Sequence, residues 1–120
     1  MIRTATLAAV ILSIGLGSSA MAHPKLTTAN PPAQGKAAVS PKTLRLTFNE
    51  PVMPNFSGVV IKNARGQAIK TSRPRVDPSD NKTLIVPLAR ALPRGLYHVA
   101  WHAVSTDTHR VSGQYDFTIG

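Results

Sequence analysis

The feature that most constrains the fold is an alternation of apolar and polar residues with a period of two. In the stretch TLRLTF, polar residues separate Leu44, Leu46 and Phe48. The stretches GLYHVAWHAV, from Gly95, and GQYDFTI, from Gly113, repeat the pattern with aromatic and aliphatic residues on one side. Successive side chains of a β-strand point to opposite faces, so the pattern predicts strands with one buried face. No window keeps a helical period over four turns.

Further short strands are expected at GVVIK, QAIK and TLIVPL, with a turn at NARG. Connectors rich in Pro, Asn and Asp separate the strands, among them NPPAQGKAAVSP and SRPRVDPSDNK. Pro87 marks the end or the edge of its strand, because proline cannot donate to a sheet ladder. About seven short strands predict an all-β fold, a Greek-key β-sandwich or barrel. We predict a single domain at residues 23–120, held without disulfides because the chain has no cysteine.

Residues 1–22 are predicted to be a cleaved secretory signal peptide. An apolar stretch from Ala5 to Gly17 follows a positive charge, and Ala20 and Ala22 occupy the small-residue positions of a cleavage site. The alternative is a membrane anchor, but the apolar run is roughly 13 residues whereas a transmembrane helix needs about 20. Cleavage after Ala22 would export a chain that begins at His23, and we predict the periplasm as its location.

The chain is strongly basic, with 14 Lys and Arg against 5 Asp and Glu and a formal net charge of +9. Such a balance suits nucleic acid or an anionic membrane surface as a partner. Export argues against nucleic acid, and the cations are scattered from Lys25 to Arg110 rather than gathered in one run. We therefore expect a solvated basic surface.

Cleavage after Ala22 would give His23 a free α-amine beside its imidazole, and these two nitrogens can chelate one metal ion. Pro24 has no amide hydrogen, so Cu(II) cannot bind the backbone nitrogen after His23 by displacing its proton. Coordination positions of the metal therefore stay available for ligands from other parts of the chain. The segment VSTDTHRVSG provides Asp107 and His109, which an extended segment would place on one face. Three nitrogens and a carboxylate suit tetragonal Cu(II), although zinc would accept the same atoms.

With these motifs the chain resembles the CopC family of periplasmic copper-resistance proteins. The matching stretches are AHPKL, PPAQG, LRLTFNEPV, YHVAWHAVSTDTHRVSG and YDFTI, which together cover essentially the whole mature chain. The resemblance implies a cupredoxin-like or immunoglobulin-like β-barrel that binds and carries Cu(II), with His23, Asp107 and His109 as metal ligands. It implies that Glu50 lies beside the site, as a weak axial ligand or as a hydrogen-bond acceptor around it. It also implies a CopD-like inner-membrane copper transporter as partner.

Other candidate metal ligands are expected to play no part in this site. Some family members carry a Met-rich Cu(I) site, but Met53 is the only methionine after residue 22 and cysteine is absent, so no Cu(I) site is expected. His98 and His102 would lie about 13 Å apart on one strand face, too far to chelate one ion, and are expected in solvent. Trp101 lies on the opposite face and is expected in the core.

Three functions are compatible with the sequence. The first is a Cu(II)-binding protein for copper resistance or homeostasis, which sequesters or delivers the metal and is not an enzyme. The second is a copper-dependent oxidative enzyme of the polysaccharide monooxygenase type, which also chelates copper with an N-terminal histidine. Such enzymes present exposed aromatic side chains, whereas this chain has one Trp, two Tyr and three Phe, most of them at inward strand positions. The third is a structural β-sandwich in which His23 is incidental. We predict the first.

Overall fold

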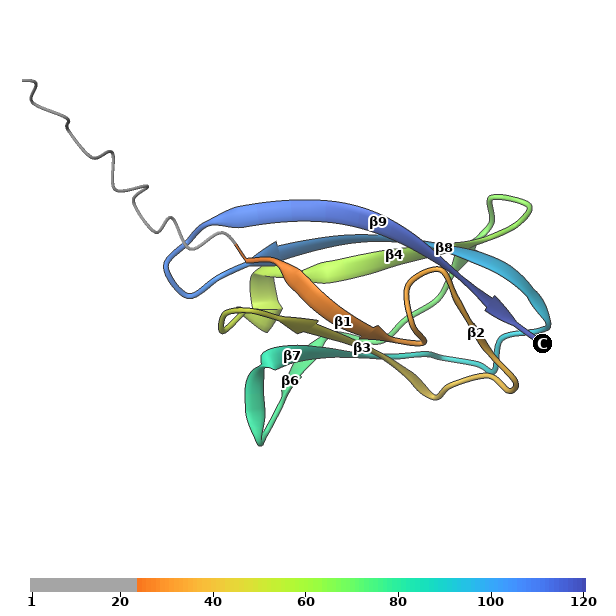
Figure 1. The fold of residues 1–120 in the computed structure, drawn as a ribbon, viewed down its shortest axis with the longest axis horizontal. Helices are drawn as coiled ribbons and strands as arrows, with labels where there is room; N and C mark the ends of the chain where they lie inside the picture. Colours follow the sequence, from red (N-terminus) through yellow and green to blue (C-terminus); the bar gives the residue numbers. More distant parts are fainter. Residues whose placement is uncertain (1–23) are drawn as a thin grey trace, which may run out of the picture.

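The computed structural model describes residues 24–120, which form two β-sheets packed face to face (Figure 1). One sheet has four strands in the order β1-β3-β7-β6, and the other has five in the order β2-β9-β8-β4-β5. A short 3-10 helix, η1 (Pro54–Phe56), precedes β4. The strand bounds are β1 Leu26–Asn30, β2 Gly35–Ala37, β3 Thr43–Phe48, β4 Gly58–Asn63, β5 Ala68–Ile69, β6 Arg75–Asp77, β7 Asp80–Pro87, β8 Gly95–Val104 and β9 Arg110–Ile119.

The apolar positions of the alternating pattern are the buried positions of the strands. On β3, Leu44, Leu46 and Phe48 are buried, and the residues between them are not. β8 and β9 form a long antiparallel hairpin whose inward side chains meet those of β3 and β7. The shared core contains Leu44, Leu46, Phe48, Val52, Ile61, Leu84, Val86, Leu92, Tyr97, Val99, Ala103, Tyr115, Phe117 and Ile119. Removal of this apolar surface from water is the main stabilising term of the fold.

The all-β sandwich is confirmed, with nine strands in residues 24–120 where the sequence predicted about seven. The strands not predicted are β1, β2 and β6, which are short, and β2 and β6 lie within segments expected to be connectors. All three lie at a sheet edge, where pairing depends on a partner distant in sequence rather than on local alternation. Pro87 ends β7, an internal strand, so it marks an end and not an edge.

The sandwich has two ends that carry different loops. β8 and β9 run between them for 10 residues each, which corresponds to about 33 Å. In Figure 1 the β8–β9 turn and the start of β1 lie at the left, and the connection from β7 to β8 lies at the right. We call residues 24–25, 49–53, 80–82 and 104–110 the Asp107 end, and residues 39–42, 63–70 and 88–95 the basic end. Within residues 24–120, no helix has the length and apolar character needed to cross a membrane.

Candidate metal centre

The turn that joins β8 to β9 carries the Asp-x-His motif. The last register pair of the hairpin is Val104 with Arg110. Beyond it, the Ser105 amide donates to the His109 carbonyl at 2.9 Å, and the Thr108 amide donates to the Ser105 carbonyl at 2.9 Å. Thr108 has a φ of 72°, in the left-handed region. The motif therefore lies on a closed turn with a fixed backbone.

This turn brings Asp107 and His109 into contact. Oδ2 of Asp107 lies 3.1 Å from Nδ1 of His109, and Oδ1 accepts a long hydrogen bond of 3.4 Å from the His109 amide. The expectation of an extended segment with both side chains on one face is wrong, because the chain reverses at Thr108. The two side chains meet through the turn instead of along a strand.

Ser105 fixes the carboxylate of Asp107. Ser105 is 1% exposed, and its hydroxyl donates to Oδ1 of Asp107. This bond, and after it the bond with His109, lowers the pKa of Asp107 below its usual value of 3.8. The side chains of Asp107 and His109 are 47% and 35% exposed, so solutes can reach the pair. This role of Ser105 was not predicted, although a serine two residues from an aspartate in a turn is typical of it.

Glu50 lies between the start of the described chain and the β8–β9 turn. On one side, the Asn49 amide donates to the Lys25 carbonyl at 3.0 Å, and the Lys25 amide donates to Oδ1 of Asn49 at 2.7 Å. On the other, the Thr106 amide donates to the Pro51 carbonyl at 3.2 Å. Oε2 of Glu50 is buried and has no hydrogen-bond partner among the described residues. A buried carboxylate oxygen without a partner is costly, so this position favours a hydrogen-bond donor or a cation.

The described chain begins at the same end of the sandwich. Pro24 is buried, and β1 starts at Leu26 opposite Phe48, the last residue of β3 (Figure 1). His23, the predicted chelating residue, lies outside the described residues. Within residues 24–120, no group of three or more His, Cys, Asp or Glu side chains could hold a metal ion. The turn thus brings together two of the predicted ligands and not a complete set.

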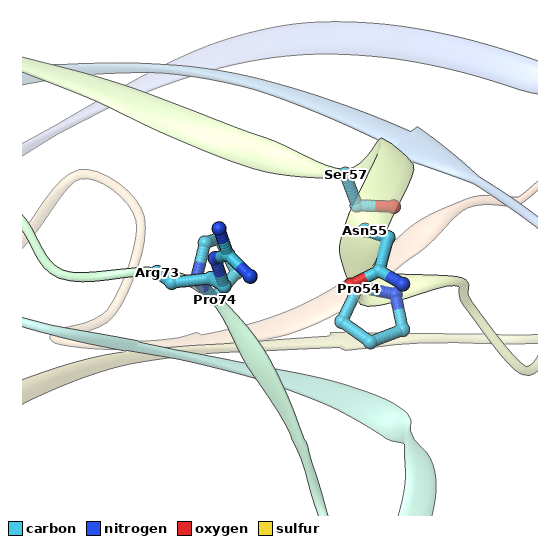
Figure 2. A pocket seen from close by; sticks show the side chains of 5 residues that line it. All are labelled: Pro54, Asn55, Ser57, Arg73 and Pro74. Atoms are coloured by element: carbon cyan, nitrogen blue, oxygen red, sulfur yellow. The ribbon is translucent and has the colours of Figure 1, made fainter.

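The residues on either side of η1 are linked by hydrogen bonds to the end of β8, just before the turn. The hydroxyl of Ser57 accepts from the Val104 amide at 3.0 Å and donates to the Met53 carbonyl at 2.7 Å. Beside η1, Pro54, Asn55, Ser57, Arg73 and Pro74 line an open pocket of about 490 Å³. Figure 2 shows Arg73 and Pro74 on one side of this pocket and the η1 residues on the other. The only charged group in its lining is a cation, so the pocket does not suit a metal ion.

The histidines of β8 lie on the outer face of the five-stranded sheet, as predicted. Nδ1 of His98 lies 2.7 Å from Oδ1 of Asp116, its cross-strand neighbour. His102 is half-buried on the same face. Trp101 points inward and packs edge to face on Phe48, with 5.3 Å between ring centroids. The partner of His98 was not predicted, because a cross-strand contact depends on the register of two strands.

Named proteins are similar to this chain over most of its length. Protein YobA of Escherichia coli is 40% identical over 101 residues, which is 84% of this chain and 82% of that protein. Copper resistance protein C of Escherichia coli is 36% identical over 114 residues, which is 90% of each chain. Copper transport protein CutJ of Bacillus subtilis is 28% identical over 111 residues, which is 92% of this chain but 20% of that longer protein.

The fold matches a solved structure as well. The crystal structure of PcoC, a methionine-rich copper resistance protein from Escherichia coli, aligns with a TM-score of 0.72 and 30% identity. The match covers 82% of this chain and 99% of PcoC. The profile of the CopC domain matches residues 26–120, which include every strand, Glu50 and the turn with Asp107 and His109. The chain belongs to the CopC family.

Proposed function

We propose that this protein binds Cu(II) in the periplasm for copper resistance and homeostasis, and that cleavage after Ala22 completes its site. The proposed ligands are the α-amine and imidazole of His23, the imidazole of His109 and the carboxylate of Asp107, which binds the metal directly or orients His109. The observation that carries the proposal is the Asp107–His109 contact of 3.1 Å at the end of the sandwich where the described chain begins. Membership of the CopC family supports it.

The donor atoms of the turn fit this metal. Imidazole nitrogen and carboxylate oxygen are donors that Cu(II) accepts in a tetragonal arrangement. Because Nδ1 of His109 faces Asp107, the carboxylate would fix the ring and direct Nε2 to the metal, as carboxylates do for many metal-bound histidines. Glu50 would act as a weak axial ligand or accept a hydrogen bond at the site, and its buried Oε2 is suited to either role.

We expect Cu(II) rather than Cu(I) as the cargo. Soft Cu(I) prefers thioether and thiolate ligands. Residues 23–120 contain Met53 as their one methionine and no cysteine, whereas the relative PcoC is described as methionine rich. A single thioether cannot build a Met-rich site, so we expect none in this protein.

The proposed role is binding and transfer rather than catalysis. Relatives that carry copper in their names are a resistance protein and a transport protein. In CutJ, a region similar to this chain makes up 20% of a copper transport protein. This arrangement supports the proposal that the present chain sequesters copper or delivers it to a membrane transporter of the CopD type.

The test is Cu(II) electron paramagnetic resonance on two chains, one beginning at His23 and one retaining Ala22. The longer chain keeps every imidazole and carboxylate but carries its free amine on Ala22, so the amine and imidazole of one histidine no longer chelate the metal together. We expect one tightly bound copper with a nitrogen-rich tetragonal spectrum in the shorter chain, and a different spectrum in the longer chain. Matching spectra would exclude the amine as a ligand and refute the site. Displacement of the copper by equimolar Zn(II) would assign the site to zinc instead.

A further inference from the structure

Five exposed cations gather at the basic end of the sandwich, although they are scattered along the sequence. They are Lys42, Arg65, Lys70, Arg90 and Arg94. Each loop at this end contributes: the connection from β2 to β3, the β4–β5 turn, the segment after β5, and the connection from β7 to β8. Arg65 and Arg94 line one open groove of about 420 Å³.

Backbone contacts hold these loops against one another. The Leu88 amide donates to the Lys42 carbonyl at 2.9 Å, and the Ala89 amide donates to the Lys70 carbonyl at 3.2 Å. A groove of about 380 Å³ has Lys70 and Arg90 in its lining, and an adjoining groove of about 420 Å³ has Lys42 and Arg90. The cations therefore form one continuous rim around this end.

The carboxylate side chains of the chain lie elsewhere. Of the 5 Asp and Glu residues, Glu50, Asp80 and Asp107 lie at the Asp107 end. The other two, Asp77 and Asp116, contact Arg45 and His98 on the outer face of a sheet. No carboxylate side chain of the described residues lies on the loops of the basic end. The α-carboxylate of Gly120 lies there beside Arg94, so the five cations keep a net positive potential.

Apolar side chains are exposed among these cations. Val39, on the loop that leads to Lys42, is 77% exposed, and Leu96, at the start of β8, is 40% exposed. An anionic membrane surface attracts each nearby Lys or Arg, and its headgroup region accepts apolar side chains. Cations on several loops around a rim match such a planar surface better than they match one acidic protein segment.

We propose that the basic end docks the protein on an anionic phospholipid surface, with the Asp107 end turned away from the membrane. β8 and β9 span the two ends with 10 residues each, about 33 Å, several times the Debye length of about 8 Å at physiological ionic strength. A metal site at the Asp107 end would therefore stay open to solvent on the docked protein. This docking goes beyond the proposed copper binding and does not depend on it.

The test is sedimentation of the metal-free protein with vesicles of phosphatidylglycerol and phosphatidylcholine, and with vesicles of phosphatidylcholine alone. The variant Lys70→Glu/Arg90→Glu reverses two cations of the rim. Its matched control, Arg75→Glu/Lys82→Glu, changes the net charge equally at exposed positions on β6 and β7. Thermal unfolding of both variants confirms that each is folded.

We expect salt-sensitive binding to the anionic vesicles alone. The rim variant should bind at least 25-fold more weakly, about fivefold for each cation lost, and the control should bind within about twofold of the original chain. Equal weakening of both variants would mean that only net charge matters and would overturn the proposal. Binding to polyglutamate but not to the anionic vesicles would assign the rim to an acidic protein partner and would also overturn it.

A fluorescent label can test which end of the sandwich faces the membrane. The chain has no cysteine, so a single introduced cysteine can be labelled specifically. An environment-sensitive fluorophore on Ala91→Cys, at the basic end, should shift to the blue on anionic vesicles. The same label on Thr106→Cys, at the Asp107 end, should not shift. A shift at Thr106→Cys alone would place the other end on the membrane and refute the proposed orientation.

Discussion

The β8–β9 hairpin carries two aspartate–histidine pairs that have similar contacts and different surroundings. His98 and Asp116 face each other across the two strands, with 2.7 Å between Nδ1 and Oδ1. His109 and Asp107 lie in the turn, with 3.1 Å between Nδ1 and Oδ2. All four side chains are between 35% and 49% exposed, so exposure does not distinguish the pairs.

The neighbours of each pair make the difference. At the end of the sandwich that carries the turn pair lie the buried hydroxyl of Ser105, the start of the described chain, and an oxygen of Glu50 that has no hydrogen-bond partner among the described residues. Around the sheet pair, His98 has Lys62 as its other register neighbour, and a cation there opposes the approach of a metal ion. A histidine–carboxylate pair is therefore a candidate metal site where further donors converge, and an ordinary surface contact where they do not.

The largest expected contrast is between the two histidines. His109→Ala removes a proposed ligand, so we expect Cu(II) affinity to fall by about 100-fold or more. Loss of a residue that only supports a metal ligand lowers affinity by about 10- to 100-fold, and loss of the ligand itself should cost at least as much. His98→Ala should change it by less than about threefold, as an ordinary surface substitution would. Competition with a chromophoric chelator measures both. Equal losses in the two variants would remove the distinction between the pairs.

The next contrast is between the two carboxylates. Asp107→Asn removes the anion that faces Nδ1 of His109, so we expect Cu(II) affinity to fall by about 10- to 100-fold. Asp116→Asn is the matched control and should leave affinity within about threefold. Calorimetric titration of Cu(II) in a competing buffer gives both values. Wild-type affinity in Asp107→Asn would mean that the carboxylate neither binds the metal nor orients the imidazole.

A smaller effect is expected from Ser105, which has no counterpart at the sheet pair. Ser105→Ala removes the donor to Asp107, so Cu(II) affinity should fall by about tenfold and the free energy of unfolding by about 1 kcal/mol. Ser112→Ala, at an exposed position of β9, is the control and should change neither. Chelator competition and urea denaturation measure the two quantities. If both variants behaved alike, Ser105 would have no particular role in the turn.

The sequence predicts the parts of the fold that depend on local pattern. β3, β8 and β9 alternate over most of their length and each buries one face, so their residues alone indicate strands. β1, β2 and β6 are strands because a longer neighbour pairs with them at a sheet edge. That pairing is a tertiary effect. A short segment such as Gly35–Ala37 has no alternating pattern from which a strand could be predicted.

In the candidate site, too, the sequence identifies some residues, while the contacts between them depend on the fold. Spacing and resemblance identify Asp107 and His109, but their contact depends on the left-handed backbone of Thr108, a conformation that a β-branched residue rarely adopts. The buried oxygen of Glu50 depends on three chain segments that meet only in the fold. His23 lies outside the described residues, so its part in the site remains a prediction from the sequence.

The smallest expected effect is on the titration of the metal-free protein. Hydrogen bonds from Ser105, and then from His109, hold the pKa of Asp107 below 3.8. The carboxylate therefore stabilises the fold at pH values above 3.8, and this contribution is lost as the pH falls through the lowered pKa.

Ser105→Ala should raise the pKa of Asp107 toward 3.8, which carbon NMR of the side-chain carboxylates can follow. Asp77, whose pKa the bond with Arg45 lowers to about 2, should not move and serves as the internal reference. If the titration of Asp107 also stayed unchanged, the hydroxyl would not be what separates the turn pair from the sheet pair.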